Sequence, residues 1–267
     1  MTLTADDFRN ENLGVQITVR TSGTGGGFKT FCAGETDISN ASRPINDTEA
    51  AACRAAGISY RQLLIANDAV SVAINPANDW ATCLTVEQLK KMWAPDAQGV
   101  VTNWNQIDAT FPDEALSLYG PGTESGTFDY FTAEINGVED ASRTDYTASE
   151  DDFLTRSGLE AFKGAIGYFG FSYLESNSGV GKAVAIDSGN GCVAPSAEAV
   201  FGGTYAPLSR PLFVYVSDTA AVRPEVKAFV EYYVDNQDRL TYDAFFVGLS
   251  DEQKSGEQAA NLSGILG

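Results

Sequence analysis

"TVRTSGTGGGFKTFCAGETDISNASRP", residues 18–44, is the stretch that says most about the fold of this chain. Its three consecutive glycines, Gly25–Gly27, allow the backbone to approach a bound group closely. They precede Phe28 and Phe31, which are spaced as the core face of a short helix that stops at Gly34. The stretch therefore predicts a strand, a turn and a helix N-terminus, where unpaired N–H groups and the helix dipole favour an anion.

Two common phosphate-binding motifs do not fit this glycine-rich turn. In both the P-loop and the dinucleotide fingerprint, a required glycine falls on Phe28, directly before Lys29 and Thr30. Two interpretations remain. One is a flexible surface turn, because loop glycines commonly mark turns. The other is an anion site to which Ser22 and Thr24 add hydroxyl groups.

A single arginine, Arg43, stands directly before Pro44 at the end of the same stretch. The proline favours an extended or turn conformation at the residue before it. A guanidinium offers a planar fork that matches phosphate oxygens, so Arg43 is a candidate ligand. The alternative is an ordinary surface arginine that pairs with one of the many acids of the chain.

A second segment, "LSLYGPGTESGTFDYFTAEING" at residues 116–137, repeats the chemistry of the first. An apolar strand leads through a Gly/Pro turn to Ser125, Gly126 and Thr127, which stand where a helix should start. The alternative is an ordinary N-cap, for which serine and threonine are favoured anyway. Two such segments, roughly 100 residues apart, predict two groups of donors that close on one tetrahedral oxyanion.

Composition narrows the class of protein. A chain of 267 residues is long enough for two α/β lobes. Its net charge of −19 argues against nucleic acids and anionic membranes as partners, although a local site can still attract an anion. The absence of histidine excludes His-dependent triads and most zinc sites. We therefore expect no metal and no cofactor.

The four cysteines are Cys32, Cys53, Cys83 and Cys192, and none belongs to a Cys-x-x-Cys pair that would indicate zinc or an iron–sulfur cluster. An even number in an acidic chain predicts two disulfides and an oxidising compartment. The alternative is four buried thiols. If disulfides form, Cys32 and Cys53 are the local pair, which leaves Cys83 for Cys192.

The start of the chain, "MTLTADDFRN", has neither the basic region nor the apolar run of a signal peptide. No segment approaches the roughly 20 apolar residues of a membrane helix. If the natural protein is exported, we expect its signal to have been removed or replaced.

Periodicity predicts an α/β fold, because apolar runs alternate with helical patterns. Strands are predicted at residues 15–19, 63–66, 69–74, 116–120, 165–171, 183–186 and 211–216. Helices are predicted at residues 46–57, 85–93 and 223–236, the last with Val226, Phe229, Val230 and Tyr233 on one face. The runs at 69–74 and 211–216 are either ordinary sheet strands or two crossovers between lobes. In the second case residues 1–74 plus 211–267 form one lobe and residues 75–210 the other.

Four segments together resemble the periplasmic phosphate-binding proteins (PstS) that serve ABC importers. They are "SGTGGGFKTFCAGETDISNASRPI", "YGPGTESGTFDYFTAEI", "GAIGYFGFSYLE" and "APSAEAVFGGTYAPLSRPLFVYV", in the order of the family. The resemblance implies a two-lobed periplasmic-binding-protein fold (type II) with two crossover hinge strands and a ligand cleft between the lobes. It also implies a monomeric receptor, not an enzyme, that binds phosphate in the periplasm or outside the cell and delivers it to an ABC permease.

The resemblance also assigns site residues. Thr24 matches a hydroxyl ligand of the family, with the N–H groups of Gly25 and Gly26 nearby. Ser125, Gly126 and Thr127 match the cluster of the second lobe.

Three departures from the family pattern change the expected site. Many members have an aspartate where Ser42 stands and an arginine where Pro121 stands. We expect Arg43 to replace the missing cation and Glu124 the missing acceptor, which would reject an unprotonated sulfate. Members also begin with a strand and a Gly-Ser/Thr loop, whereas this chain opens at the following helix. Either the chain is trimmed, the element lies elsewhere, or the site is incomplete.

Three other functions stay open. The first is a binder of another oxyanion or small organic ligand on the same fold. The second is an enzyme that acts on phosphoesters through carboxylates such as Asp37, Glu124 and Asp129, which show no recognised metal spacing. The third is a sensory or surface-attached module.

Overall fold

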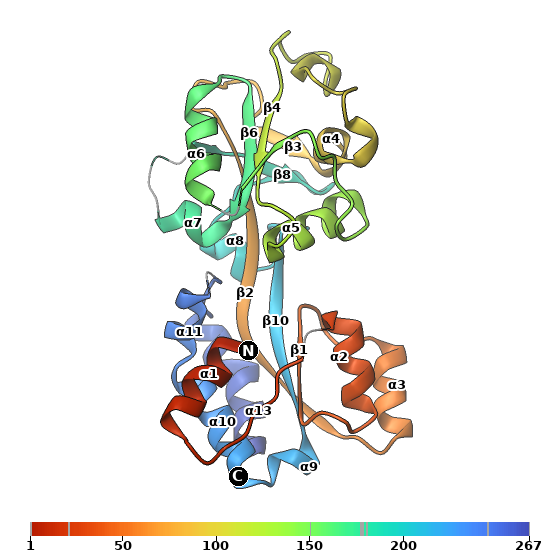
Figure 1. Ribbon diagram of the computed structural model, residues 1–267, viewed down its shortest axis with the longest axis vertical. Coiled ribbons are helices and arrows are strands. Elements are labelled where there is room, and N and C mark those ends of the chain that lie inside the picture. The colour runs from red at the N-terminus through yellow and green to blue at the C-terminus, as the bar shows by residue number, and fades with distance from the viewer. Residues whose placement is uncertain are drawn as a thin grey trace. The chain divides into compact units, whose positions relative to one another are not determined.

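The computed structural model describes residues 2–20, 22–149, 151–176, 179, 181–244 and 246–266. The chain has a mixed α/β fold and divides into two compact units (Figure 1). Unit 1 comprises Met1–Asn67 and Arg210–Gly267, and unit 2 comprises Asp68–Ser209. The lobe boundaries predicted from the sequence fall after residues 74 and 210. The chain passes between the units within strand β2 (Tyr60–Ile74) and at the first residue of β10 (Ser209–Ser217). Their role as hinges stays a prediction.

Unit 1 places helices on both sides of three neighbouring strands. Strand β1 (Ile38–Ala41) pairs antiparallel with β10, which lies beside β2. The helices are α1 (Thr2–Glu11), α2 (Gly23–Cys32), α3 (Asp47–Ala55), α9 (Asp218–Ala221), α10 (Pro224–Asp235), α11 (Gln237–Asp243), α12 (Asp251–Gln253), the π-helix η4 (Lys254–Gln258) and α13 (Ala259–Leu266).

Side chains of β10 alternate between two cores of unit 1. Val214 and Val216 pack with α1, α10 and α13 in one cluster of buried residues. Phe213 and Tyr215 pack with α2 and α3 in another. Figure 1 shows these two groups of helices on opposite sides of the strands. Because successive residues of a strand face opposite ways, one strand anchors both helical layers.

The helices predicted at residues 46–57, 85–93 and 223–236 are present as α3, α4 and α10. Asn46 and Glu49 form a capping box at the start of α3, and Thr85 and Gln88 form one at the start of α4 (Val86–Trp93). In α10, the four apolar residues predicted to share a face are all buried, namely Val226, Phe229, Val230 and Tyr233. Burial of such side chains contributes about 1.5–3 kcal/mol each, which outweighs the intrinsic propensity of a short helix.

Unit 2 contains two sheets. Strands β6 (Ala165–Gly170), β4 (Ser117–Gly120) and β5 (Thr147–Ala148) follow the second half of β2 in one sheet. Strands β3 (Cys83–Thr85), β8 (Ala185–Asp187) and β9 (Cys192–Val193) form the other. The helical segments are α4, η1 (Pro95–Ala97), η2 (Trp104–Gln106), α5 (Gly126–Phe131), the π-helix η3 (Thr132–Asn136), α6 (Asp152–Ala161), α7 (Phe171–Ser176) and α8 (Ala197–Phe201).

Both predicted disulfides are present. Cys32 and Cys53 join α2 to α3 in unit 1. Cys83 and Cys192 join β3 to β9 in unit 2, where β8 lies between these strands. The alternative of four buried thiols is therefore wrong, and each unit has one covalent cross-link of its own.

Three strand predictions need correction. Residues 15–19 form no strand, because Val15 and Ile17 pack onto the α1–α10–α13 core of unit 1. Residues 63–66 and 69–74 belong to one strand, β2. The run at 183–186 is split: β7 (Lys182–Ala183) pairs with β2 and β8 pairs with β3. The switch occurs at Val184, whose N–H donates to the Val72 carbonyl at 2.9 Å.

A buried arginine holds part of unit 2 together. Arg143 is 4% exposed, and its Nη1 donates to the carbonyl oxygens of Met92 at 3.0 Å and Val101 at 2.9 Å. Its Nη2 donates to Asp145 Oδ2 at 2.8 Å. The hydrogen bonds from Arg143 lower the pKa of Asp145 to about 2. Because every donor contact goes to a backbone oxygen or a carboxylate, the charge is tolerated inside the unit.

Candidate functional site

The three glycines of the opening stretch lie inside a helix and not in the turn before it. Helix α2 begins at Gly23, whose φ of +64° favours glycine, and Ser22 is its N-cap residue. A Cβ on Gly27 would lie 2.8 Å from Ser39 Oγ of β1. The close approach predicted for this glycine is therefore to a neighbouring strand. A Cβ on Gly25, by contrast, would lie 3.9 Å from Glu49 Oε1 and 4.0 Å from Arg43 Nη2.

The first turn of α2 lacks the side-chain cap that such a helix usually has. Ser22 accepts no hydrogen bond from the helix, so its oxygen does not satisfy the first backbone N–H groups, which have no partner within the helix. Thr24 Oγ1 instead accepts from the backbone N–H of Ser42 at 3.1 Å and lies 3.1 Å from Ser42 Oγ. The structure thus brings two predicted ligands, Thr24 and Ser42, together at the N-terminus of α2.

Arg43 is paired with an acid that the sequence analysis did not single out. Its Nη1 donates to Glu49 Oε2 at 2.9 Å and its Nη2 to Glu49 Oε1 at 2.8 Å. Nη1 also donates to the Pro44 carbonyl at 3.1 Å. The alternative that Arg43 pairs with an acid is therefore correct, and its role as a ligand stays a prediction. The only sequence signal for Glu49 is its third position in the capping box of α3.

The Arg43 guanidinium lies over an aromatic ring that is itself packed against a second ring. The Arg43 guanidinium lies 5.8 Å from the centre of the Phe28 ring, a distance at which a cation is attracted to a ring face. Phe28 packs edge-on against Tyr215, with ring centres 4.8 Å apart. The Tyr215 hydroxyl accepts from Ile45 N at 2.9 Å and donates to Gln62 Oε1 at 2.6 Å. The chain just after Arg43 is therefore fixed to the core of unit 1.

Both members of the ion pair are charged over the physiological range. The hydrogen bonds from Arg43 lower the pKa of Glu49, and the same bonds raise the pKa of Arg43. The arginine side chain is 42% exposed and that of Glu49 is 16% exposed. One face of the guanidinium therefore meets solvent beside α2, while the carboxylate is largely covered.

In unit 2, the predicted cluster lies at the start of α5. Ser125 is the N-cap residue, and its Oγ accepts from the Thr127 backbone N–H at 3.2 Å. Gly126 and Glu124 are exposed, and a Cβ on Gly126 would meet no atom within 4 Å. The ordinary N-cap interpretation of Ser125 is therefore correct as a description of its hydrogen bond. The ligand role of these four residues stays a prediction, as it does for Thr24, Gly25, Gly26, Ser42 and Arg43.

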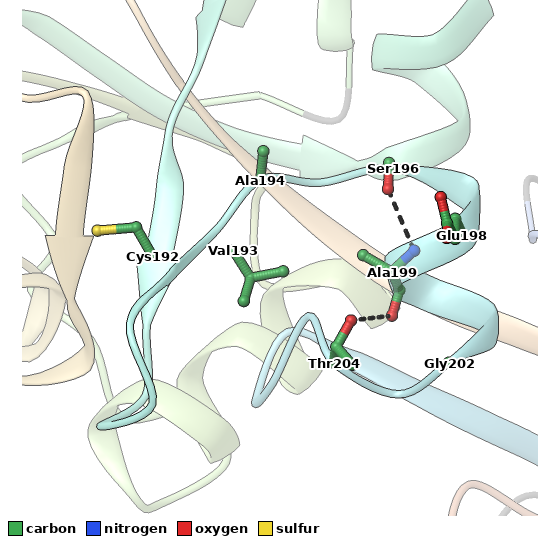
Figure 2. A pocket seen from close by; sticks show the side chains of 8 residues that line it. All are labelled: Cys192, Val193, Ala194, Ser196, Glu198, Ala199, Gly202 and Thr204. Atoms are coloured by element: carbon green, nitrogen blue, oxygen red, sulfur yellow. Dashed lines mark hydrogen bonds between the residues drawn. The ribbon is translucent and has the colours of Figure 1, made fainter.

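A pocket of about 500 Å³ in unit 2 does not suit an anion (Figure 2). Ser196 Oγ accepts from Ala199 N at 3.1 Å, and Thr204 Oγ1 donates to the Ala199 carbonyl at 3.3 Å, so both hydroxyls serve the backbone. Among its eight lining residues, Glu198 alone has an ionisable side chain, and its charge is negative. The lining residues are Cys192, Val193, Ala194, Ser196, Glu198, Ala199, Gly202 and Thr204.

Within the described part of the chain, no group of three or more acidic or cysteine side chains is placed to hold a metal ion. In the same residues, no helix has the length and apolar character needed to span a bilayer.

Known proteins resemble this chain over nearly its whole length. A family model described as "PBP superfamily domain" matches residues 1–237. Protein SphX of Synechocystis sp. is 47% identical over 247 residues, which are 92% of this chain and 74% of that protein. Phosphate-binding protein PstS of Staphylococcus saprophyticus is 32% identical over 264 residues, 98% of this chain and 80% of that protein.

A solved structure is similar throughout. The crystal structure of a possible phosphate binding protein from Planctomyces limnophilus is 41% identical, with a TM-score of 0.94, and the match covers 100% of this chain and 94% of that one. Since the family model covers most of the chain and PstS is similar over nearly all of it, the chain belongs to the PBP superfamily and, within it, to the family of the phosphate-binding proteins named PstS.

Proposed function

We propose that this chain is a receptor that binds inorganic phosphate and delivers it to an ABC importer without changing it chemically. The observation that carries the proposal is the arrangement at the start of α2. There Arg43 Nη2 and its partner Glu49 Oε1 lie 4.0 Å and 3.9 Å from the position of a Cβ on Gly25, and the Thr24 and Ser42 hydroxyl oxygens lie 3.1 Å apart. Membership of the PstS family supports the same ligand.

The charges at this end of unit 1 suit an anion although the chain as a whole is acidic. Backbone N–H groups at the first positions of α2 have no partner within the helix, and the helix dipole places partial positive charge there. Arg43 adds a positive charge beside Gly25, which the Glu49 carboxylate at the same place offsets in part, while two N–H groups of the guanidinium stay open to an anion. The net charge of −19 acts over longer distances and is screened by salt, whereas the local donors act at contact.

We further propose that Ser125, Gly126 and Thr127 supply donors to the same phosphate, and that Glu124 accepts its proton. The resemblance of Ser125, Gly126 and Thr127 to the second-lobe cluster of the family supports their assignment, and Glu124 is proposed because Ser42 stands where many members have an aspartate. A protonated phosphate satisfies such an acceptor, whereas a fully ionised sulfate leaves it unpaired and repelled. Glu124→Gln should therefore narrow the gap between phosphate and sulfate affinities. A variant that still rejects sulfate as strongly as the natural sequence removes Glu124 from this role.

Calorimetric titration of phosphate into the protein tests the main proposal. We expect one phosphate per chain, with sulfate as a control that gives little heat. Affinity should fall from low to high salt only modestly, because the site is built from short contacts. No heat with phosphate, or tighter binding of molybdate or arsenate, would mean that another ligand is the natural one.

An assay with a chromogenic phosphoester separates the receptor from an enzyme. We expect no hydrolysis under conditions in which phosphate binds. A Ser or Asp nucleophile or a carboxylate-bound metal would be required for turnover, so measurable hydrolysis that is lost with Asp129→Asn would favour the enzyme.

The two disulfides support a location outside the reducing cytosol, in the periplasm or beyond the cell. There the receptor would meet its permease as a monomer. Sedimentation of the purified chain, with and without phosphate, tests the monomer.

A further inference from the structure

The Arg43–Glu49 ion pair lies at the candidate site, beside the start of α2. We infer that Glu49 is a positioning residue that turns the Arg43 guanidinium toward the bound anion. This inference rests on the proposed function, because it names the part of the site that orients its cation. Glu49 itself does not contact the phosphate in this account.

The hydrogen bonds of Arg43 use one part of the guanidinium and leave another part open. Arginine has five N–H donors. Two of them go to the Glu49 carboxylate, and the other Nη1 hydrogen goes to the Pro44 carbonyl. The remaining two, Nε–H and the second Nη2–H, lie on one edge and point in parallel. Among the described residues they have no acceptor. Two parallel N–H groups are the fork that matches two oxygens of a phosphate.

This open edge is next to the N-terminus of α2. Nη2 belongs to the edge, and a Cβ on Gly25 would lie 4.0 Å from it and 3.9 Å from the Glu49 Oε1 to which it donates. The phenyl ring of Phe28 lies under the guanidinium, so the plane of the group is restricted as well. An anion that accepts from the first N–H groups of α2 is therefore within reach of the fork.

Glu49 is itself held in place. Its Oε2 accepts from Asn46 N at 3.0 Å as well as from Arg43 Nη1, and the Asn46 side chain accepts from Glu49 N at 2.9 Å. The carboxylate is thus fixed to the first turn of α3. The Cys32–Cys53 disulfide joins α3 to α2. The carboxylate that orients Arg43 is therefore held at a fixed position relative to α2.

Two effects of Glu49 on the anion oppose each other. Its carboxylate orients the cation, which favours binding, but its negative charge repels phosphate through space. Removal of the charge alone would strengthen binding, whether or not Arg43 is present. Loss of orientation would weaken binding, and only when Arg43 is present. The direction of the change and its dependence on Arg43 therefore distinguish the two effects.

Three variants separate orientation from charge. Glu49→Gln removes the charge but keeps a residue that can complete the capping box. Glu49→Asp keeps the charge but shortens the side chain, so the two-point contact with Arg43 is lost. Ser250→Ala removes the capping side chain of α12, which lies in the same unit and forms no hydrogen bond with Arg43 or Glu49, so it controls for the loss of a helix cap as such.

We expect Glu49→Gln and Glu49→Asp each to raise the Kd for phosphate by about fivefold or more, and Ser250→Ala to change it less than about twofold. When each is combined with Arg43→Ala, neither Glu49 change should weaken binding further. The inference is overturned if Glu49→Gln binds phosphate as tightly as the natural sequence or more tightly. Equal losses with and without Arg43 would also overturn it.

A second measurement needs no ligand. In nitrogen-15 spectra of the phosphate-free protein, a guanidinium held at two points shows slow rotation about Cζ–Nη. We expect slow rotation for Arg43 and fast rotation in Glu49→Gln. Fast rotation in the natural sequence, in a protein that binds phosphate, overturns the inference and leaves the proposed function intact. A natural protein that binds no phosphate overturns the proposed function, and this inference with it, whatever the spectra show.

Discussion

Two helices of this chain begin with the same three residues and differ in what those residues do. Ser22-Gly23-Thr24 starts α2, and Ser125-Gly126-Thr127 starts α5. Ser125 caps its own helix by accepting from Thr127 N, whereas Ser22 makes no side-chain cap. The backbone angles explain the difference: Ser125 is extended, and Ser22, with φ −155° and ψ 11°, is not.

The same tripeptide therefore serves two purposes in this chain. At α5 the Ser125 hydroxyl accepts from the Thr127 N–H of the first turn, and the neighbouring ionisable side chain, Glu124, is negative. At α2 the first N–H groups have no side-chain cap from Ser22, and the neighbouring charges are those of the Arg43–Glu49 ion pair. The start of α2 therefore keeps backbone N–H groups without a side-chain cap, whereas the start of α5 has its N-cap hydrogen bond in place.

The units also differ in their cross-links, and this gives the largest expected effect. The Cys32–Cys53 bond joins residues 21 apart, and Cys83–Cys192 joins residues 109 apart. In the loop-entropy account, removal costs about 3 kcal/mol for the shorter loop and about 5 kcal/mol for the longer one. Replacement of each pair by alanine should lower the free energy of urea unfolding in that order.

Tryptophan fluorescence makes this test specific to one unit. Trp80, Trp93 and Trp104 all lie in unit 2, so fluorescence follows unit 2 while circular dichroism follows both. Removal of the Cys83–Cys192 bond should shift the fluorescence transition more than removal of the other bond. Equal losses from the two pairs would contradict the loop-length account, because they would mean that the unfolded chain does not gain the expected freedom.

The second effect concerns binding at α2. Arg43→Ala should weaken phosphate binding at least about tenfold, about 1.4 kcal/mol, because it removes the cation beside the first turn. Arg223→Ala is the matched control: it removes an exposed arginine of the same unit that is also paired with an acid, Asp37. The control should leave calorimetric affinity within about twofold. If Arg43→Ala changes affinity no more than the control, Arg43 is not a ligand.

Local patterns in the sequence predicted those parts of the molecule that are decided locally. The helices at residues 46–57 and 85–93 and the buried face of α10 depend on residues within a few positions of one another. The local disulfide pair and the remaining pair were also predicted correctly. By contrast, residues 15–19 have a strand-like alternation but cover a helical core, since no pattern within a segment says which surface lies beside it.

The predicted site residues show the same limit. Thr24, Ser42 and Arg43 were predicted from the sequence as ligands, and the structure places them around the start of α2. It could not identify Glu49, because the choice of one acid among 36 acidic residues depends on how α3 packs beside α2. The buried Arg143 was missed for a similar reason, since its partners at Met92 and Val101 are about 40 to 50 residues away.

The third effect tests the two caps directly. Ser125→Ala should destabilise the chain by about 1 kcal/mol, because it leaves the Thr127 N–H of α5 without its acceptor. Ser22→Ala should change stability by only a few tenths of a kcal/mol, since Ser22 makes no cap to lose. Thermal unfolding of the two variants measures the difference. Equal losses would mean that Ser22 caps α2 in solution and that the contrast between the two helices does not hold.

The smallest effect compares the two arginine–carboxylate pairs through pH. Asp145 has a pKa of about 2 in the folded chain against an ordinary 3.8, so its pairing with Arg143 adds stability above about pH 4 and loses it as the pH falls toward 2. Because the Asp145 side chain is 35% exposed, solvent screening reduces this contribution to about 1 kcal/mol or less. Asp145→Asn should therefore unfold more readily at pH 7 and lose less stability than the natural sequence between pH 4 and 2. The pKa of Glu49 is also lowered in the folded chain. Glu49→Gln should therefore also reduce the loss of stability at acidic pH, but through unit 1. If fluorescence, which follows unit 2, responds to Glu49→Gln as strongly as to Asp145→Asn, the two pairs do not act on separate units.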